Sequence, residues 1–459
     1  MAESNFSLQK TLTMLLDEKK YHSLRDILST MNPADIAAIF DDLDQARLPL
    51  LFRLLPKELA AETFVEMEPE AQELLIQGFS DSELKEVIDE LYVDDAVDIV
   101  EEMPANVVQR ILSQAEPEMR KQINEILRYP EDSAGSIMTT EYVSLRPNMT
   151  VGEAILRIRR TGIDKETIYT CYVTRGHKLI GMVTVKTLLL CEDDDTLIED
   201  IMQEHVITVN TTDDQEVVAQ MFSKYDFLAL PVVDTENRLV GIVTFDDAWD
   251  VMEDEATEDM EKMAAMLPSE HPYMRSTPVE IWKNRIPWLL LLMISATLTG
   301  LVISHFETAL GVLPCLTAFI PMLMDTGGNA GSQACVSIIR GISLNEIEFR
   351  DLFRVVWKEI RVAVLCGVCL AAACFAKVML VDHLLMHNES VTSTVALVVC
   401  ISMALTVFMA KLVGSTLPLL AKKIGFDPAV MASPFITTIV DALSLLIYFG
   451  IASVLLRIG

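Results

Sequence analysis

The sequence is short of positive charge. Of its 459 residues, 36 are lysine or arginine and 67 are aspartate or glutamate, so the net charge at neutral pH is −31. A surface this acidic repels nucleic acid and anionic lipid headgroups, and it attracts cations. Nucleic acid is therefore excluded as an expected partner.

A secretory signal peptide is also missing. The first thirty residues contain eight charged side chains and no apolar run of signal-peptide length. We therefore expect the N-terminus to stay in the cytoplasm.

Patterns typical of enzymes are absent as well. The sequence shows no nucleophile–base pair and no metalloprotease spacing, and the glycine-rich stretch 325–333 is not followed by the Gly-Lys-Ser/Thr of a phosphate loop. Six of the eight cysteines lie in the apolar C-terminal part without metal-finger spacing. We therefore do not expect an enzyme.

The charges that are present are segregated along the chain. Residues 286–459 contain ten acidic and ten basic side chains, so residues 1–285 hold the other 57 acids and 26 bases. The mean hydropathy of the whole chain is nevertheless positive. The sequence therefore predicts a neutral membrane half joined to a strongly acidic soluble half.

The soluble half begins with an internal repeat. Similar amphipathic segments open at Ala34, Glu58 and Ser82, 24 residues apart, with weaker copies between them. A period of about 12 residues gives helices too short to be stable alone, so they must stack on one another. We expect an acidic helical superhelix over residues 1–130.

Residues 136–250 contain a second repeat of a different kind. The segment Leu179–Thr184, Leu-Ile-Gly-Met-Val-Thr, matches Leu239–Thr244, Leu-Val-Gly-Ile-Val-Thr. Each half is predicted to form a strand, a helix, two β-branched strands and a closing helix. This pattern resembles a tandem pair of cystathionine-β-synthase (CBS) domains, which are commonly regulatory and bind adenosine nucleotides or metal ions.

The segment 246–275 is predicted to be an acidic connecting helix. Between Asp246 and Glu270 it has ten acids and one lysine. Carboxylates at helical spacing repel one another, and bound cations would relieve that repulsion. A solubilising linker is the alternative interpretation.

Residues 286–459 contain five candidate membrane spans. They are Ile286–Phe306, Thr308–Ile339, Val362–Val381, Ser390–Ala421 and Pro428–Leu456. Lysine and arginine gather before the first span and in alternate connections, so the positive-inside rule puts the acidic half in the cytoplasm and the C-terminus outside.

One carboxylate stands inside the fifth span. Asp441 is the only side chain between Pro428 and Leu456 that is charged at neutral pH, and it lies too deep for its short side chain to reach either interface. Burying this charge costs free energy that only a partner or water offsets. A cation site is the functional interpretation, and a hydrogen bond to a neighbouring helix is the structural one.

The order of these parts is similar to that of the MgtE family of magnesium channels. The membrane half contains Thr-Gly-Gly-Asn-Ala-Gly-Ser-Gln at 326–333 and Asp-Pro-Ala at 427–429, followed by Pro434 and Asp441. The resemblance implies a homodimer with one pore on its two-fold axis. It implies these pore residues: Asp441, Asn329, Ser332 and Ser433. It implies these cytoplasmic magnesium-sensing residues: Glu62, Asp94, Asp98, Asp214, Glu216, Asp226, Asp247, Asp250, Glu255, Glu258 and Asp259.

The sequence and the resemblance together predict a Mg²⁺-selective channel in the plasma membrane, the inner membrane of a bacterium. Cytoplasmic Mg²⁺ would close it by binding the acidic domains. An alternating-access divalent-cation carrier and a nucleotide-sensing membrane receptor are the alternatives. ATP is a candidate second ligand, although Thr187 stands where nucleotide-binding copies often place an aspartate.

Overall fold

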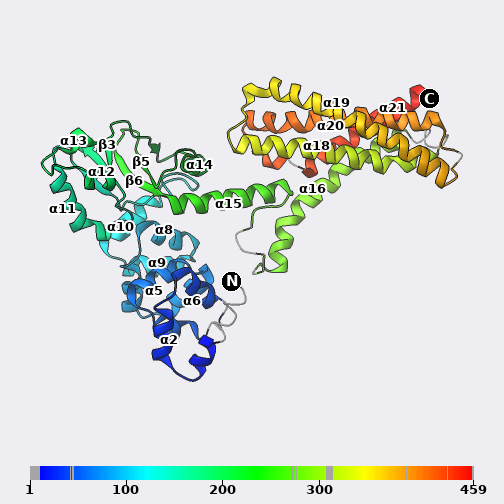
Figure 1. Ribbon diagram of the computed structural model, residues 1–459. Coiled ribbons are helices and arrows are strands. Elements are labelled where there is room, and N and C mark those ends of the chain that lie inside the picture. Colours follow the sequence, from blue (N-terminus) through cyan, green and yellow to red (C-terminus); the bar gives the residue numbers. More distant parts are fainter. Residues whose placement is uncertain are drawn as a thin grey trace. The chain divides into compact units, whose positions relative to one another are not determined.

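The computed structural model describes residues 11–41, 43, 46–269, 273–274, 276–306, 314–388, 390–431 and 433–456, without the side chain of Ser433. The chain divides into two compact units, residues 1–252 and 253–459 (Figure 1). Each unit is described by itself.

The first unit begins with short helices. They are α2 (Tyr21–Leu28), α3 (Pro33–Asp41), α4 (Leu48–Phe52), α5 (Lys57–Val65), α6 (Pro69–Gly78), α7 (Asp81–Ile88), α8 (Val93–Glu102), α9 (Ala105–Gln114) and α10 (Pro117–Ile126). Proline at the first position starts α6 and α10, and a capping box of Ser80 and Glu83 starts α7.

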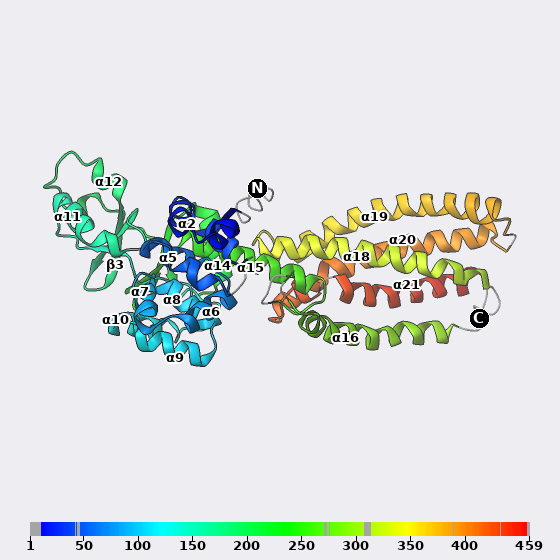
Figure 2. The ribbon, with the colours of Figure 1, turned by 90° about the horizontal axis from the view of Figure 1, so that it is seen from below.

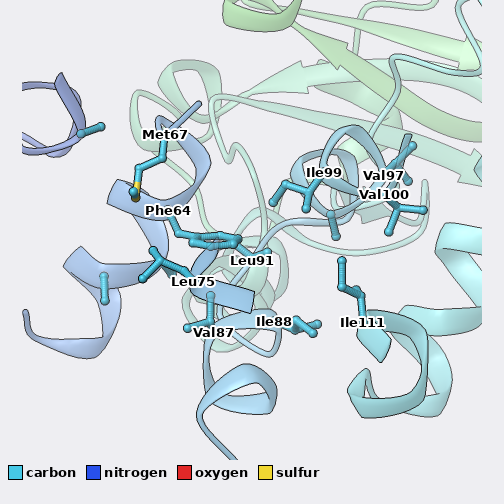
Figure 3. Packing of buried hydrophobic residues seen from close by; sticks show 14 of the residues in the cluster. Phe64, Met67, Leu75, Val87, Ile88, Leu91, Val97, Ile99, Val100 and Ile111 are labelled. Carbon is cyan, nitrogen blue, oxygen red and sulfur yellow. The ribbon is translucent and has the colours of Figure 1, made fainter. Parts of the chain in front are cut away.

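These helices stack in the way that their length requires. Helix α5 packs on α3 and α7, and α7 packs on α9, so that each helix covers the next but one. Figure 3 shows the shared core, in which Phe64 lies against Leu75 and Leu91. The predicted superhelix of short helices is confirmed.

Two similar α/β halves follow. The first has β1 (Val143–Leu145), α11 (Val151–Thr161), the 3₁₀ turn η1 (Gly162–Asp164), β2 (Thr170–Arg175), β3 (Lys178–Thr184), α12 (Val185–Leu189) and α13 (Ile198–Ile201). The second has β4 (Val209–Asn210), α14 (Gln215–Tyr225), β5 (Ala229–Val233) and β6 (Leu239–Thr244). Each sheet has three strands in chain order, the first pair parallel and the second antiparallel.

The glycine of the repeated strand has a packing role in both halves. A Cβ at Gly241 would lie 2.8 Å from the carbonyl oxygen of Thr139, and a Cβ at Gly181 would lie 3.0 Å from that of Gln203. Thr139 precedes the first half but bonds to Ile242 of the second, with N···O distances of 2.8 and 2.9 Å. Glycine therefore allows the segment before each half to pair with the other half.

Helix α15 (Phe245–Met263) is shorter than the predicted connecting helix. The prediction of one helix as far as residue 270 was wrong, because Ala265 adopts a left-handed conformation with φ of 54° and Pro268 follows. The acidic residues of this helix therefore all lie within 19 residues.

The second unit consists of long helices. They are α16 (Pro278–His305), η2 (Pro314–Phe319), α18 (Ile320–Ser343), η3 (Phe349–Asp351), α19 (Leu352–Lys377), the π-helical η4 (Val378–Leu385), α20 (Ser393–Lys423), η5 (Ala429–Met431) and α21 (Ser433–Leu456). Within the described ranges, four segments are long and apolar enough to cross a membrane: Pro278–His305, Phe349–Leu385, Ser393–Lys423 and Ala429–Leu456.

Helix α18 corresponds to the predicted second span, with different bounds. It begins at Ile320 rather than Thr308, after η2, and it continues to Ser343. Its 24 residues extend about 36 Å, enough to cross a hydrocarbon core. It is not among the four apolar segments, since glycines and polar side chains make up much of its middle.

Glycines let α18 approach its neighbours closely. Figure 2 shows α18 beside α20 and α21. A Cβ at Gly331 would lie 2.8 Å from Ile436 of α21, and a Cβ at Gly414 of α20 would overlap the carbonyl oxygen of Gly331. Small residues at such crossings are typical of membrane helices. This packing fixes α18 against the helix that carries Asp441.

Candidate cation sites

The first candidate site lies between α18 and α21. Asp441 is half-buried near the middle of α21, and the negative charge of Asp325 on α18 acts on it. Asn329, one turn further along α18, donates a hydrogen bond from Nδ2 to Oδ1 of Asp325 at 3.2 Å. Two carboxylates and one amide are thus gathered from two neighbouring helices.

The outer face of α18 is polar along its length. Asp325, Asn329, Gln333, Ser337 and Arg340 follow one another at helical spacing, and all five are exposed in the single chain. A polar face of this length is unfavourable against lipid tails, so it requires water or another protein surface.

The predicted pore residues fare differently in the structure. Asp441 and Asn329 lie on facing helices as expected, and Ser332 is half-buried on α18. The side chain of Ser433 lies outside the described residues, although α21 begins there. Asp325 was not among the predicted site residues, although a charged side chain inside a span was the signal that could have found it.

The second candidate site is an acidic cluster in the first unit. It combines three aspartates of α8, one glutamate just before β1, one glutamate just after η1 and the first two aspartates of α15. Its members are Asp94, Asp95, Asp98, Glu141, Glu166, Asp246 and Asp247. Carboxylate oxygens of Asp94, Glu141 and Glu166 lie within 4.8 Å of one another.

The cluster leaves buried oxygens without hydrogen-bond donors. Asp94 is 7% exposed, and its Oδ1 has no hydrogen-bond partner; neither has Oε2 of Glu166. Glu141 accepts one bond from the backbone N–H of Val93 at 3.2 Å. Buried carboxylates without enough donors are costly, and a bound cation would stabilise them.

The pKa values of the cluster reflect the same shortage. Burial, followed by repulsion from neighbouring carboxylates, raises the pKa of Asp94 to about 7 and that of Asp98 to about 8. For the same two reasons the pKa of Glu166 rises to about 9. Oxygen ligands of this kind suit Mg²⁺, and Asp94, Glu141 and Glu166 are placed to hold it.

The cluster predicts how the stability of the metal-free protein depends on pH. These carboxyl groups are protonated more readily when folded than when unfolded, so stability falls as pH rises from about 4 to about 9. In EDTA, the unfolding temperature of the first unit, residues 1–252, should be lower at pH 9 than at pH 6 by about 5 °C or more. Excess Mg²⁺ should abolish most of that difference. Thermal unfolding followed by circular dichroism measures it. A pH-independent transition in EDTA would contradict the prediction.

A third group of charges lies in the second unit and is centred on Lys262. Nζ of Lys262 on α15 lies 2.6 Å from Oε1 of Glu258 and 2.8 Å from Oδ2 of Asp427, just before η5. Burial alone would lower the pKa of Lys262, but its bonds to the two carboxylates raise it above the ordinary value. Oδ2 of Asp259 accepts a hydrogen bond from Ser343 at 3.2 Å. The end of α15 is thus attached to the α20–α21 connection and to the end of α18.

Three of the predicted sensing residues, Asp94, Asp98 and Asp247, belong to the acidic cluster. Two others, Glu258 and Asp259, lie beside Lys262. The other six lie elsewhere: Glu62, Asp214, Glu216, Asp226, Asp250 and Glu255.

Local structure explains the positions of some of these six residues. Asp214 caps α14 by accepting the N–H of Glu216 at 2.9 Å, and Asp226 ends the same helix in a left-handed conformation. Glu62 is exposed on α5. Their role in sensing stays a prediction.

The sequence reasoning missed Glu141 and Glu166 as members of the acidic cluster. Each is a single acid in an irregular segment, so no spacing marks it as a ligand. Only the fold brings both to α8.

Comparison with known proteins agrees with this arrangement. The family model for the MgtE intracellular N domain matches residues 31–132, and the CBS domain model matches residues 134–192 and 198–248. The MgtE model, described as a divalent cation transporter, matches residues 320–451.

Similar proteins cover nearly the whole chain. The magnesium transporter MgtE of Thermus thermophilus is 37% identical over 455 residues, which is 98% of this chain and 99% of that protein. The magnesium transporter MgtE of Bacillus subtilis is 32% identical over 443 residues, 96% of each. A solved structure of the cytosolic domain of the Mg²⁺ channel MgtE in complex with ATP is 38% identical, covers 53% of this chain and 99% of that one, and has a TM-score of 0.51. The chain belongs to the MgtE family of divalent cation transporters.

Proposed function

We propose that this protein conducts Mg²⁺ into the cell across the bacterial plasma membrane. The observation that carries the proposal is Asp441, a lone carboxylate in a membrane-length helix, near Asp325 of α18, which accepts a hydrogen bond from Asn329. The relatives named as magnesium transporters support Mg²⁺ as the transported ion.

The chemistry of the site suits a hydrated ion. Mg²⁺ loses water reluctantly and is usually held by one or two carboxylates while it keeps several waters. Asp441 and Asp325 supply such carboxylates, and Asn329, Ser332 and Ser433 are proposed to complete the polar lining. A cage that removed all the water would need more ligands than these helices offer.

The proposed assembly is a homodimer. The exposed polar face of α18 requires contact with water rather than lipid. A second copy of the same face, related by a two-fold axis, would enclose a water-filled space between the two faces. Each copy is proposed to span the membrane five times, through α16, α18, α19, α20 and α21, with its N-terminus in the cytoplasm and its C-terminus outside.

The chain is proposed to divide into four parts. These are the superhelical N domain (1–130), the CBS pair (136–250), the connecting segment (246–275) and the pore domain (286–459).

Gating is proposed to depend on cytoplasmic Mg²⁺. Without it the carboxylates of the acidic cluster repel one another, and with it they are bridged, so the ion favours the compact, closed state. The eleven sensing residues predicted from the resemblance are retained in this role, with Glu141 and Glu166 added.

ATP stays a candidate regulatory ligand because a relative's cytosolic domain binds it. In this chain the carboxylate of Asp247 accepts bonds from the hydroxyl and N–H of Thr244 and also belongs to the acidic cluster. In the first half, Thr184 caps α12 by accepting the N–H of Thr187. Neither half therefore presents a free carboxylate at this position to a ribose.

The direct test is ion uptake by the purified protein in liposomes that contain a Mg²⁺-sensitive dye. We expect Mg²⁺ to enter down its gradient, and competition with Mn²⁺, Co²⁺ and Ni²⁺ to set the selectivity. Single-channel recording separates a channel from a carrier, since a carrier is too slow to give unitary currents. Absence of divalent flux would reject the proposal, and the receptor alternative would then stand.

Replacing Glu166 by glutamine tests the acidic cluster. Above pH 9, where the carboxyl group of Glu166 is ionised in the metal-free protein, glutamine removes one buried charge. At that pH the metal-free variant should unfold at a higher temperature than the unmodified protein, and added Mg²⁺ should raise that temperature less. The matched control is Glu192→Gln, at an exposed position in the same CBS half. Equal responses of the two variants to Mg²⁺ would remove Glu166 from the site.

A further inference from the structure

The first CBS half contains a cavity of about 570 Å³ at the end of its sheet, where β1 ends and β2 turns into β3. Residues at the ends of β1 and β2 line it, together with side chains of α11 and α13. They include Ser144, Arg146, Arg157, Arg175, His177 and Glu199. Its volume lies within the range of small-molecule sites.

The charge of this cavity is opposite to that of the surrounding chain. Three arginines and one histidine line it against a single acid, although residues 1–285 contain 57 acids and 26 bases. One guanidinium nitrogen of Arg175 lies 3.9 Å from Oε2 of Glu199. Arg146 and Arg157 have no ion-pair partner in the part of the chain that the structure describes. The cavity therefore concentrates unneutralised positive charge.

The backbone around the cavity is held in place. Gly176 and His177 both have positive φ, 58° and 71°, which makes a tight two-residue turn between β2 and β3. The carbonyl oxygen of His177 accepts the N–H of Leu239 at 3.0 Å, which joins the turn to the second half. The hydroxyls of Ser144 and Thr174 lie 3.0 Å apart in the cavity lining.

The second CBS half provides an internal comparison. The two halves align on the helix N-caps Thr150 and Asp214 and on Leu179 and Leu239. In that alignment the second half has Asn210, Met221, Thr235 and Asn237 in place of the four basic residues. The CBS fold therefore does not require a basic cavity here, and only one half has it.

The cavity is also separate from the strand-end positions associated with nucleotides. In the register of β2 and β3, Arg175 pairs with Lys178 at one end, whereas Thr170 pairs with Thr184 at the other. A ligand in the basic cavity would lie at the sheet end opposite Thr184.

We propose that this cavity binds the phosphate chain of a small molecule. Guanidinium groups bind phosphate oxygens through paired, charge-assisted hydrogen bonds, and several such groups around one cavity favour a multiply charged anion over a single carboxylate. The phosphate chain comes from an inorganic polyphosphate or from a nucleotide, and both present the same oxygens. This inference does not depend on the proposed transport function.

The test is calorimetric titration of the full-length protein in discs of zwitterionic lipid, without Mg²⁺. The probes are sodium tripolyphosphate and ATP, with sulfate at equal ionic strength as the reference. We expect tripolyphosphate to bind, and the double variant Arg146→Gln/Arg157→Gln to weaken it by about tenfold or more. The control is Arg159→Gln/Arg160→Gln, which removes the same charge from exposed positions of α11 outside the cavity lining.

The outcomes separate the alternatives. Equal weakening of tripolyphosphate and ATP by the first variant identifies the phosphate chain as the bound group, and weakening of ATP alone identifies a nucleotide as the source. Weakening of tripolyphosphate alone identifies an inorganic polyphosphate as the source. Equal weakening by both double variants, binding of both probes unaffected by the first variant, or no binding of either probe would overturn the proposal. In the unmodified protein, tripolyphosphate should also protect Arg146 and Arg157 from phenylglyoxal, and failure to protect them would overturn it even if the variants did not fold.

Discussion

Replacing Asp441 by asparagine should reduce Mg²⁺ uptake into proteoliposomes to the level of vesicles without protein. Asparagine keeps the size of the side chain and its hydrogen-bonding capacity but removes the charge that attracts a hydrated divalent cation in the middle of α21. Because the charge is unfavourable in the membrane, its removal should leave folding and assembly intact or improve them. Loss of uptake with an unchanged elution volume therefore identifies conduction, rather than folding, as the property that depends on Asp441.

A matched control separates the pore from the membrane domain in general. Asp382 also lies in the second unit, at the π-helical end of α19, where its carboxylate is 2.8 Å from Nζ of Lys377. Asp382→Asn should retain most of the uptake, since that carboxylate is already paired. Normal uptake by Asp441→Asn, or equal loss in both variants, would defeat the pore assignment.

The sequence could predict the parts of this protein that repeat. Short helices follow from a period of about 12 residues, because each helix needs the next to bury its apolar face. The CBS halves follow from two copies of one strand, and the glycine in that strand has a packing reason in both. Such features are local, so their pattern is visible without the fold.

The parts that sequence reasoning missed are assembled from distant segments. Glu141 and Glu166 reach Asp94 only through the packing of α8 against the first CBS half. Lys262 reaches Asp427 only because α15 ends beside the α20–α21 connection. In a sequence with 67 acidic residues, nothing in the local pattern indicates which residues a given carboxylate contacts in the folded protein. The left-handed Ala265 that ends α15 was equally hidden, since alanine usually favours helix.

Neutralising Glu255, Glu258 and Asp259 together should leave the channel conducting at Mg²⁺ concentrations that close the unmodified protein. The carboxylates proposed to bind the closing ion are lost, and so are the bonds of Glu258 to Lys262 and of Asp259 to Ser343. The loss of the Asp259–Ser343 bond weakens the attachment of α15 to α18, although Lys262 still contacts Asp427. Uptake measured with high Mg²⁺ inside the vesicles should show flux in the triple variant and none in the unmodified protein. Glu192→Gln/Asp194→Asn/Asp195→Asn removes the same charge from exposed positions and should close normally.

Lys262→Gln distinguishes the two causes of closure. Its ammonium group lies between Glu258 and Asp427, so it holds α15 in the absence of any metal ion and competes with one for the same carboxylates. If Mg²⁺ closes the pore by binding these carboxylates, the lysine variant should still close, and at a lower Mg²⁺ concentration because its competitor is gone. If the lysine bridge alone holds the closed state, the variant should conduct at every Mg²⁺ concentration. Closure of the triple variant at the normal concentration would reject sensing at this end of α15 altogether, and the acidic cluster around Asp94 would then be the remaining candidate sensor.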